Sequence, residues 1–243
     1  MNEASDISIA DQLLRLETTK TWSLIATVFG DLEEDHISGK ALRNLLEPLN
    51  IKPEAMRVAL HRLKKDGWIV SEKNGREMIY RLSDHGRQET RAAREDVYRR
   101  DVKFPDGWRV VLLPSNAAPI DDVHISLERS VYLAPKGAAL PRSAVELAPP
   151  DVMPNWFAER LVPDQVLQQA AALTDLATQF LTTKPTQASS VSIRLMFLHY
   201  WRRMALRTGV WAHIGLFPTG VMSECHAAMC KVFDQTQRTR PSP

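Results

Sequence analysis

The chain has 243 residues, of which 44% are hydrophobic and 25% are charged, a composition that is typical of an ordinary globular protein. Its two cysteines, Cys225 and Cys230, are too few for a disulfide framework. No stretch reaches the roughly 18 consecutive apolar residues of a membrane-spanning helix, and the acidic first residues lack the apolar segment of a signal peptide. We therefore expect a cytoplasmic protein that does not span a membrane.

The net charge of +2 is unevenly distributed along the chain. Residues 1–39 contain 2 basic and 8 acidic side chains, whereas residues 40–100 contain 15 basic and 9 acidic ones. A basic excess can neutralise the phosphates of DNA, which supplies most nonspecific DNA affinity. A solvated helix face explains the charge alone more simply, so the predicted fold has to decide between the two interpretations.

Three helices are predicted in the first part of the chain. Apolar residues recur at helical spacing over residues 20–32. Ser38 can cap a second helix over residues 39–49, and after a short turn Pro53 suits the first position of a third helix. Gly67 is the predicted end of this third helix.

The third helix has one apolar face and one basic face. On a helical wheel, the residues predicted to face the core are Met56, Ala59, Leu60 and Leu63. The residues on the opposite arc are Arg57, Val58, His61, Arg62 and Lys65. A helix with a basic outward face, placed a short turn after another helix, is typical of a DNA recognition helix. Arginine can pair with guanine, and the methyl groups of Val58 can contact thymine.

A basic hairpin is predicted directly after this helix. Residues 68–73 and 76–82 alternate like strands, and Asn74-Gly75 has the composition of a two-residue turn. Lys73 and Arg76 flank the tip, where they are placed to contact phosphates. Because a hairpin at this point is typical of a wing, the sequence predicts a winged helix-turn-helix that binds double-stranded DNA, and an ordinary three-helix core is the alternative.

The predicted fold class is α+β, with three domains. Residues 1–100 form the winged helix-turn-helix and a linker helix that Ser83 caps. Residues 101–162 form a small α/β middle domain with few strands, expected at 108–113, 123–127, 130–134 and 145–147. Residues 163–243 form a helical domain, whose apolar stripes are either an intramolecular core or a dimer interface. Since regulators that read paired half-sites have two-fold symmetry, we expect a homodimer.

The first hundred residues also resemble a known family. The runs Ser23–Asp31 and Leu42–Arg87 are similar to the N-terminal domain of PaaX-type regulators, the repressors of phenylacetate degradation. The residues that match the family pattern are Arg57, Arg62, Gly67, Trp68, Tyr80, Arg81 and Leu82. The resemblance implies a repressor of an aromatic-catabolism operon that responds to phenylacetyl-CoA or a related acyl-CoA thioester.

A second similarity to this family lies near the C-terminus. Arg194, His199 and Arg202 fall on its Arg-x-x-x-x-His-x-aromatic-Arg pattern, and Trp201 is the aromatic residue. The resemblance makes these four residues candidates for the effector site, whereas on the residues alone a hydrogen-bonded core histidine is the simpler interpretation. Between residues 116 and 131 the chain departs from the family, because the stretch is too short for the expected crossover helix.

No motif for catalysis or for metal binding is visible. A glycine-rich phosphate loop, a nucleophile elbow and a His-Glu-x-x-His motif are missing from the sequence. Cys225 and Cys230 are separated by about 140° around a helix, which keeps them from converging on one ion. We expect no catalytic residues, no metal and no cofactor. Two other functions remain as alternatives: a protein-interaction module built on a winged helix, and an enzyme that processes acyl-CoA esters.

Overall fold

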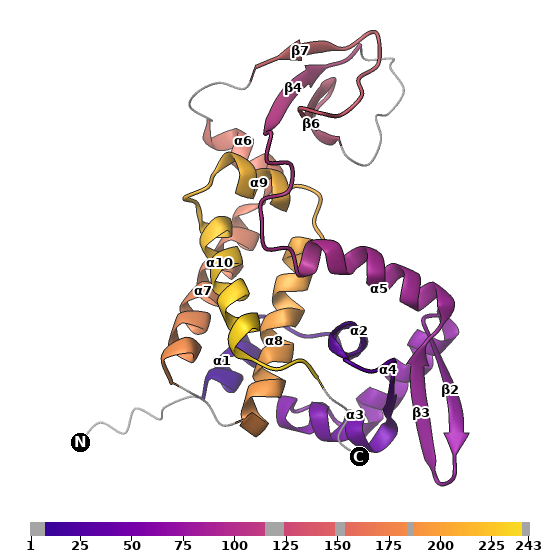
Figure 1. The fold of residues 1–243 in the computed structure, drawn as a ribbon. Coiled ribbons are helices and arrows are strands. Elements are labelled where there is room, and N and C mark those ends of the chain that lie inside the picture. Colours follow the sequence, from indigo (N-terminus) through magenta and orange to yellow (C-terminus); the bar gives the residue numbers. More distant parts are fainter. Residues whose placement is uncertain (1–7, 115–123, 149–153, 184–186, 240–243) are drawn as a thin grey trace, which may run out of the picture.

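The centre of the molecule is a helical core that joins the beginning and the end of the chain. The computed structural model describes residues 8–114, 124–148, 154–183 and 187–239. In its centre lies α8 (Gln187–Ala205), on which every residue from 192 to 201 is buried. The helices around it are α1 (Ile9–Leu16), α2 (Thr21–Asp31), α7 (Asp164–Thr183) and α10 (Val221–Gln235) (Figure 1). The described part of the chain contains no helix with the length and apolarity needed to cross a membrane.

A second group of elements follows α2. It consists of α3 (Gly39–Leu46), a short 3-10 helix (Glu47–Leu49), α4 (Pro53–Lys65) and the strands β2 (Ile69–Asn74) and β3 (Glu77–Leu82). Ser38 caps α3, as predicted, by accepting a hydrogen bond of 3.1 Å from the amide of Ala41. Strand β1 (His36–Ser38), which was not predicted, pairs with β3 in a three-stranded antiparallel sheet of order β1-β3-β2.

The hairpin β2-β3 is confirmed, but its turn lies one residue later than the sequence indicated. Asn74 pairs with Glu77 at the end of the ladder, so the two connecting residues are Gly75 and Arg76 rather than Asn74 and Gly75. Gly75 has a φ of 60°, which suits a two-residue hairpin turn that begins with glycine. Arg76 therefore lies at the tip itself.

Helix α5 (Asp84–Val97) leads from the hairpin to the middle of the molecule, where it contacts α8 (Figure 1). As predicted, the side chain of Ser83 caps it by accepting a hydrogen bond of 3.0 Å from the amide of Gly86. A Cβ atom on Gly86 would lie 2.2 Å from the carbonyl oxygen of Trp68. Only glycine permits this approach, which fixes the first turn of α5 against the junction between α4 and β2.

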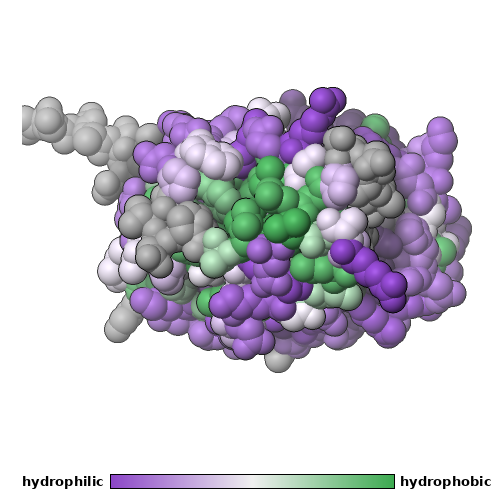
Figure 2. Space-filling model, turned by 90° about the horizontal axis from the view of Figure 1, so that it is seen from above, coloured by the Kyte–Doolittle hydropathy of each residue, from purple (hydrophilic) through white to green (hydrophobic). Residues whose placement is uncertain are grey.

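The four strands predicted in the middle of the chain are confirmed and form one antiparallel sheet. They are β4 (Trp108–Leu112), β5 (Ile125–Glu128), β6 (Val131–Pro135) and β7 (Val145–Leu147), in the order β5-β6-β4-β7. Two short helices, α6 (Asn155–Leu161) and α9 (Val210–Leu216), were not predicted. Seen from above, this end of the molecule presents a hydrophobic patch (Figure 2), and the edge strand β7 exposes Val145 and Leu147.

Candidate nucleic-acid interface

Helix α4 buries one face and exposes the other, as its sequence predicts. Its buried residues are Met56, Ala59, Leu60 and Leu63, and α2 packs against it. The predicted outward residues Arg57, Val58, His61, Arg62 and Lys65 are all exposed. Val58 is 70% exposed, more than any other large apolar side chain in the described part of the chain, which places its methyl groups where a partner can contact them.

The hairpin is held against the C-terminal end of α4. The amide of Trp68 donates a hydrogen bond of 2.8 Å to the carbonyl of Leu63, and Lys64 Nζ donates one of 2.9 Å to Ser71 Oγ. The two predicted tip residues, Lys73 and Arg76, are exposed. Because the helix and the strands are connected at this junction, the position of the hairpin relative to α4 is fixed.

A hollow of about 340 Å³ lies between α3, α4 and the hairpin. Its lining contains four basic side chains and one acidic one, which are Lys40, Arg43, Arg57, Arg76 and Glu77. Sequence analysis identified Arg57 and Arg76 but missed Lys40 and Arg43, both of which are exposed on α3. A periodicity argument confined to α4 could not find them, since their position depends on the packing of α3 against strand β3 of the hairpin.

Arg62 differs from the other basic residues of α4 because it has two partners. Its guanidinium carbon lies 4.7 Å from the ring centroid of Trp22 on α2, in a cation–π contact. Its Nε atom lies 3.6 Å from a carboxylate oxygen of Asp66. The side chain is nevertheless 56% exposed, so it stays accessible while Trp22 holds its orientation.

The four predicted effector residues on α8 fall into two pairs. Arg194 is buried and directs its guanidinium to Asp31, at 2.9 Å between Nη2 and Oδ1, and to Thr236 Oγ1, also at 2.9 Å from Nη1. Trp201 is buried and donates a hydrogen bond of 2.9 Å from Nε1 to the carbonyl of Val97. These contacts connect α8 to α2, α5 and α10, and they occupy the polar atoms of both side chains with partners inside the protein.

His199 and Arg202 form the second pair, beside a pocket of about 400 Å³ between α2 and α8. We call it the α2–α8 pocket; its lining residues are Glu17, Thr18, Lys20, Trp22, Ser23, His199, Arg202, Arg203 and Leu206. Burial, followed by the positive charges of Arg202 and Arg203, lowers the pKa of His199 to about 3. The imidazole is therefore neutral at physiological pH.

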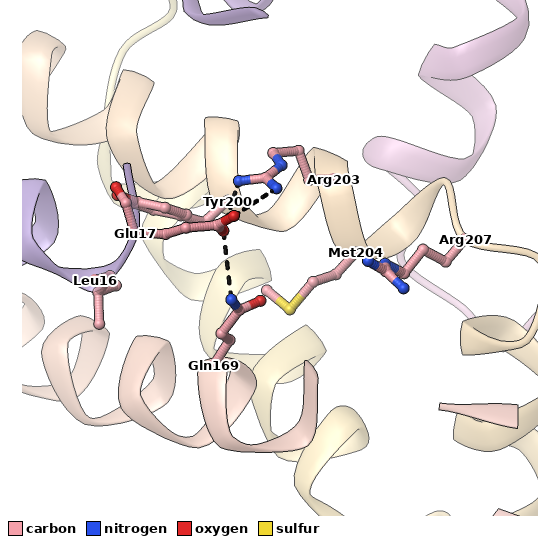
Figure 3. A pocket seen from close by; sticks show the side chains of 7 residues that line it. All are labelled: Leu16, Glu17, Gln169, Tyr200, Arg203, Met204 and Arg207. Carbon is pink, nitrogen blue, oxygen red and sulfur yellow. Dashed lines mark hydrogen bonds and ion pairs between the residues drawn. The ribbon is translucent and has the colours of Figure 1, made fainter. Parts of the chain in front are cut away.

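Arg203, unlike Arg202, has a carboxylate partner. Figure 3 shows the neighbouring pocket, in which Glu17 accepts hydrogen bonds from both terminal nitrogens of Arg203, at 2.6 and 2.9 Å, and from Gln169 at 3.3 Å. The hydrogen bond from Arg203 is the main cause that lowers the pKa of Glu17. The negative charge of Glu17 is thus directed at Arg203, whereas Arg202, which also lines the α2–α8 pocket, forms no ion pair with a carboxylate among the described residues.

Comparison with known proteins identifies the segment that contains this surface. Residues 20–86 match the family model described as PaaX-like protein. We refer to residues 20–86 as the PaaX-like domain because of this similarity. Over 95 residues the chain is 38% identical to the transcriptional repressor PaaX of Escherichia coli (strain K12), a match that covers 37% of this chain and 30% of that protein. The chain is also similar to the solved structure of the uncharacterized protein Rv0674 from Mycobacterium tuberculosis, with a TM-score of 0.42, 16% identity and coverage of 90% and 98% of the two chains.

The PaaX-like domain contains every element of the candidate interface. Helices α3 and α4 and the hairpin β2-β3 all lie within residues 20–86, and so does Trp22, which supports Arg62. The effector candidates on α8 lie outside this range. The match therefore covers the basic surface but not the α8 wall of the α2–α8 pocket.

Proposed function

We propose that this protein is a transcriptional repressor that binds double-stranded DNA through a winged helix-turn-helix. In this proposal α3 and α4 are the helix-turn-helix and the hairpin β2-β3 is the wing. Arg57, Val58, His61, Arg62 and Lys65 read the major groove, while Lys73 and Arg76 contact phosphates. The observation that carries the proposal is the exposed basic face of α4, which continues through the hollow lined by Arg57 and Arg76 to the tip of the hairpin.

The similarity to a repressor supports the same proposal. A relative that matches 37% of the chain is named a transcriptional repressor, and the arginines of α4 are the side chains best suited to bidentate recognition of guanine. A solvated helix face would not require an exposed valine between two arginines. Val58 in this position suits contact with a thymine methyl group.

The finer proposal concerns regulation and assembly. We propose that the repressor is a cytoplasmic homodimer that controls a catabolic operon and responds to an acyl-CoA, with phenylacetyl-CoA or a related thioester as the first candidate. His199 and Arg202 are proposed to contact the effector. Arg194 and Trp201 are proposed to hold α8 in position through their contacts with α2, α10 and α5. We propose that residues 1–100 bind DNA, that residues 101–162 form the middle unit, and that residues 163–243 bind the effector and form the dimer interface.

Selection of bound duplexes from a random DNA pool, followed by fluorescence anisotropy at fixed salt, tests the proposal. We expect a recurrent sequence with two related half-sites. Arg57→Ala combined with Arg62→Ala removes this binding while the far-ultraviolet circular dichroism stays unchanged. The matched control is Arg15→Ala combined with Lys231→Ala, which removes two exposed positive charges on α1 and α10. Equal affinity of the double variant and the control would refute the role of α4.

A further inference from the structure

We infer that Cys230 is an oxidative modification site, at which the sulfur atom, paired with the imidazole of His226, attacks hydrogen peroxide and becomes a sulfenic acid. The two residues lie four positions apart on α10 and therefore share one face of this helix. The pair lies outside the PaaX-like domain, and its chemistry does not depend on DNA binding. The contacts of the sulfur, the surroundings of the imidazole and the exposure of the thiol support the inference.

The sulfur of Cys230 faces a nitrogen that carries a hydrogen atom. His226 Nε2 lies 2.7 Å from the carbonyl oxygen of Arg99 and 3.5 Å from Cys230 Sγ. Because a carbonyl oxygen only accepts hydrogen bonds, the shorter contact requires a proton on Nε2. The sulfur is then the acceptor of the same N–H group, whereas its contact as a donor to the Arg99 carbonyl is longer, at 3.9 Å. An N–H donor favours the thiolate over the thiol.

Two indole rings surround the imidazole of His226. It stacks on Trp201, with 5.5 Å between the ring centroids and an angle of 21° between the planes, and it lies nearly perpendicular to Trp211 at 5.2 Å. The face of an indole ring attracts a cation. Burial lowers the pKa of His226, but the hydrogen bonds with Cys230 and with the carbonyl of Arg99 outweigh it and raise the pKa above its usual value. The imidazole can therefore hold a second proton beside the sulfur.

The positive charges near the sulfur favour its ionised form. Burial raises the pKa of the Cys230 thiol, but the hydrogen bond with His226 and the charges of His226 and Arg100 outweigh it, so the pKa lies below its usual value. Arg100 is fixed at this place because it donates a hydrogen bond of 2.9 Å to the carbonyl of Cys230 and pairs with Asp234 at 2.6 Å. The segment after α5 thus contributes to the site together with α10.

The two cysteines of the chain differ in their access to a reagent. Cys230 is partly exposed, and Ala227 and Asp234, about one turn before it and one turn after it, are exposed. Cys225 is 0% exposed, and burial raises the pKa of its thiol to about 12. Because the thiolate is the reactive form of cysteine, we expect Cys225 to be inert. Cys230 combines a stabilised thiolate with access from solvent, which is typical of an oxidisable cysteine.

The reaction of this pair with hydrogen peroxide is balanced. The thiolate of Cys230 attacks one peroxide oxygen, so that an S–O bond forms and the O–O bond breaks; the sulfur is oxidised and the peroxide is reduced. The leaving hydroxide takes a proton from the imidazolium of His226 and departs as water. A neutral sulfenic acid beside a neutral imidazole remains. Oxidation therefore removes the charge-assisted contact within the pair.

Alkylation of the folded full chain by iodoacetamide over a series of pH values, followed by peptide mass spectrometry, tests the state of both thiols. We expect a midpoint for Cys230 below about 8.5, the value of an unperturbed thiol, and no reaction of Cys225. His226→Phe keeps an aromatic ring beside the indoles, slows the alkylation of Cys230 at pH 7 and moves the midpoint toward about 8.5. Arg100→Gln, at an exposed position, moves it in the same direction. The matched control Lys231→Gln removes the exposed charge next to Cys230 in the sequence and keeps the wild-type midpoint.

Treatment with hydrogen peroxide and then with dimedone, which labels sulfenic acids, tests the reaction itself. We expect the label on Cys230 and none on Cys225, a slower labelling in His226→Phe, and no label in Cys230→Ser or after dithiothreitol, since thiols reduce a sulfenic acid. A wild-type Cys230 with an unperturbed midpoint, or one that takes up no dimedone, would overturn the inference. Equal midpoints in the wild type and Arg100→Gln would do the same, even if circular dichroism shows that His226→Phe does not fold.

Discussion

Arg194 on α8 and Asp31 at the end of α2 form an ion pair that is buried on both sides. The Nη2–Oδ1 distance is 2.9 Å, and the two side chains are 2% and 0% exposed. Asp31 also accepts hydrogen bonds from Tyr98 Oη at 2.9 Å and from the amide of Thr239 at 3.0 Å. Burial, followed by the charge of Asp31, raises the pKa of Tyr98. The pair therefore joins the PaaX-like domain to the C-terminal helices.

Removing one member of this pair destabilises the protein strongly. Arg194→Met leaves the carboxylate of Asp31 buried without its cation, and we expect a loss of about 3–5 kcal/mol in the free energy of unfolding. Urea denaturation followed by circular dichroism measures this loss. The double variant Arg194→Met/Asp31→Leu recovers part of the stability, because it buries no unpaired charge. A loss of less than about 1 kcal/mol in Arg194→Met, as for an exposed pair, would contradict the assignment.

The stability of the protein also depends on pH through His199. Its pKa of about 3 in the folded state lies below the value of about 6.5 for an unperturbed histidine. The unfolded chain therefore binds a proton at a higher pH than the native protein does, so the stability is full above pH 6.5 and decreases as the pH falls toward 3. Urea denaturation at pH 7 and pH 5 is expected to show a smaller decrease for His199→Gln than for the wild type. An identical decrease in both proteins would exclude this contribution.

Lys40 and Arg43 are expected to contribute to DNA binding although the α4 pattern does not include them. Both line the hollow that also contains Arg57 and Arg76. The variant Lys40→Ala/Arg43→Ala is expected to weaken binding to all sequences alike, since contacts with phosphates carry no base preference. Anisotropy titrations on a selected duplex and on a scrambled duplex measure this. A loss confined to the selected duplex would indicate contacts with bases instead.

The sequence predicted the elements whose pattern is local. The apolar face of α4 follows from Met56, Ala59, Leu60 and Leu63 alone, and Ser38 and Ser83 cap helices because the hydrogen bond reaches only three residues along the chain. The predicted position of the hairpin turn was wrong by one residue. The composition Asn-Gly favoured a turn at residues 74–75, whereas the pairing of Asn74 with Glu77 places the turn at Gly75 and Arg76.

Local sequence patterns could not predict the contacts between residues that lie far apart in the chain. Arg194 fits an effector motif in the sequence, but its partner Asp31 lies 163 positions away. The stacking of Arg62 on Trp22 and the approach of α3 to the hairpin depend in the same way on packing between separate elements. The short elements α1 and β1 were missed, since a few residues carry too little periodicity to distinguish them from loops.

The salt dependence of DNA binding tests the central claim most directly. We predict a steep linear fall of log K with log salt concentration for the wild type. Its slope becomes shallower by about 1.8 in Lys73→Ala/Arg76→Ala, because each lost phosphate contact changes the slope by about 0.9. This variant removes two exposed cations from the hairpin. The control Arg15→Ala/Lys231→Ala keeps the wild-type slope. The same slope in all three proteins would contradict the account.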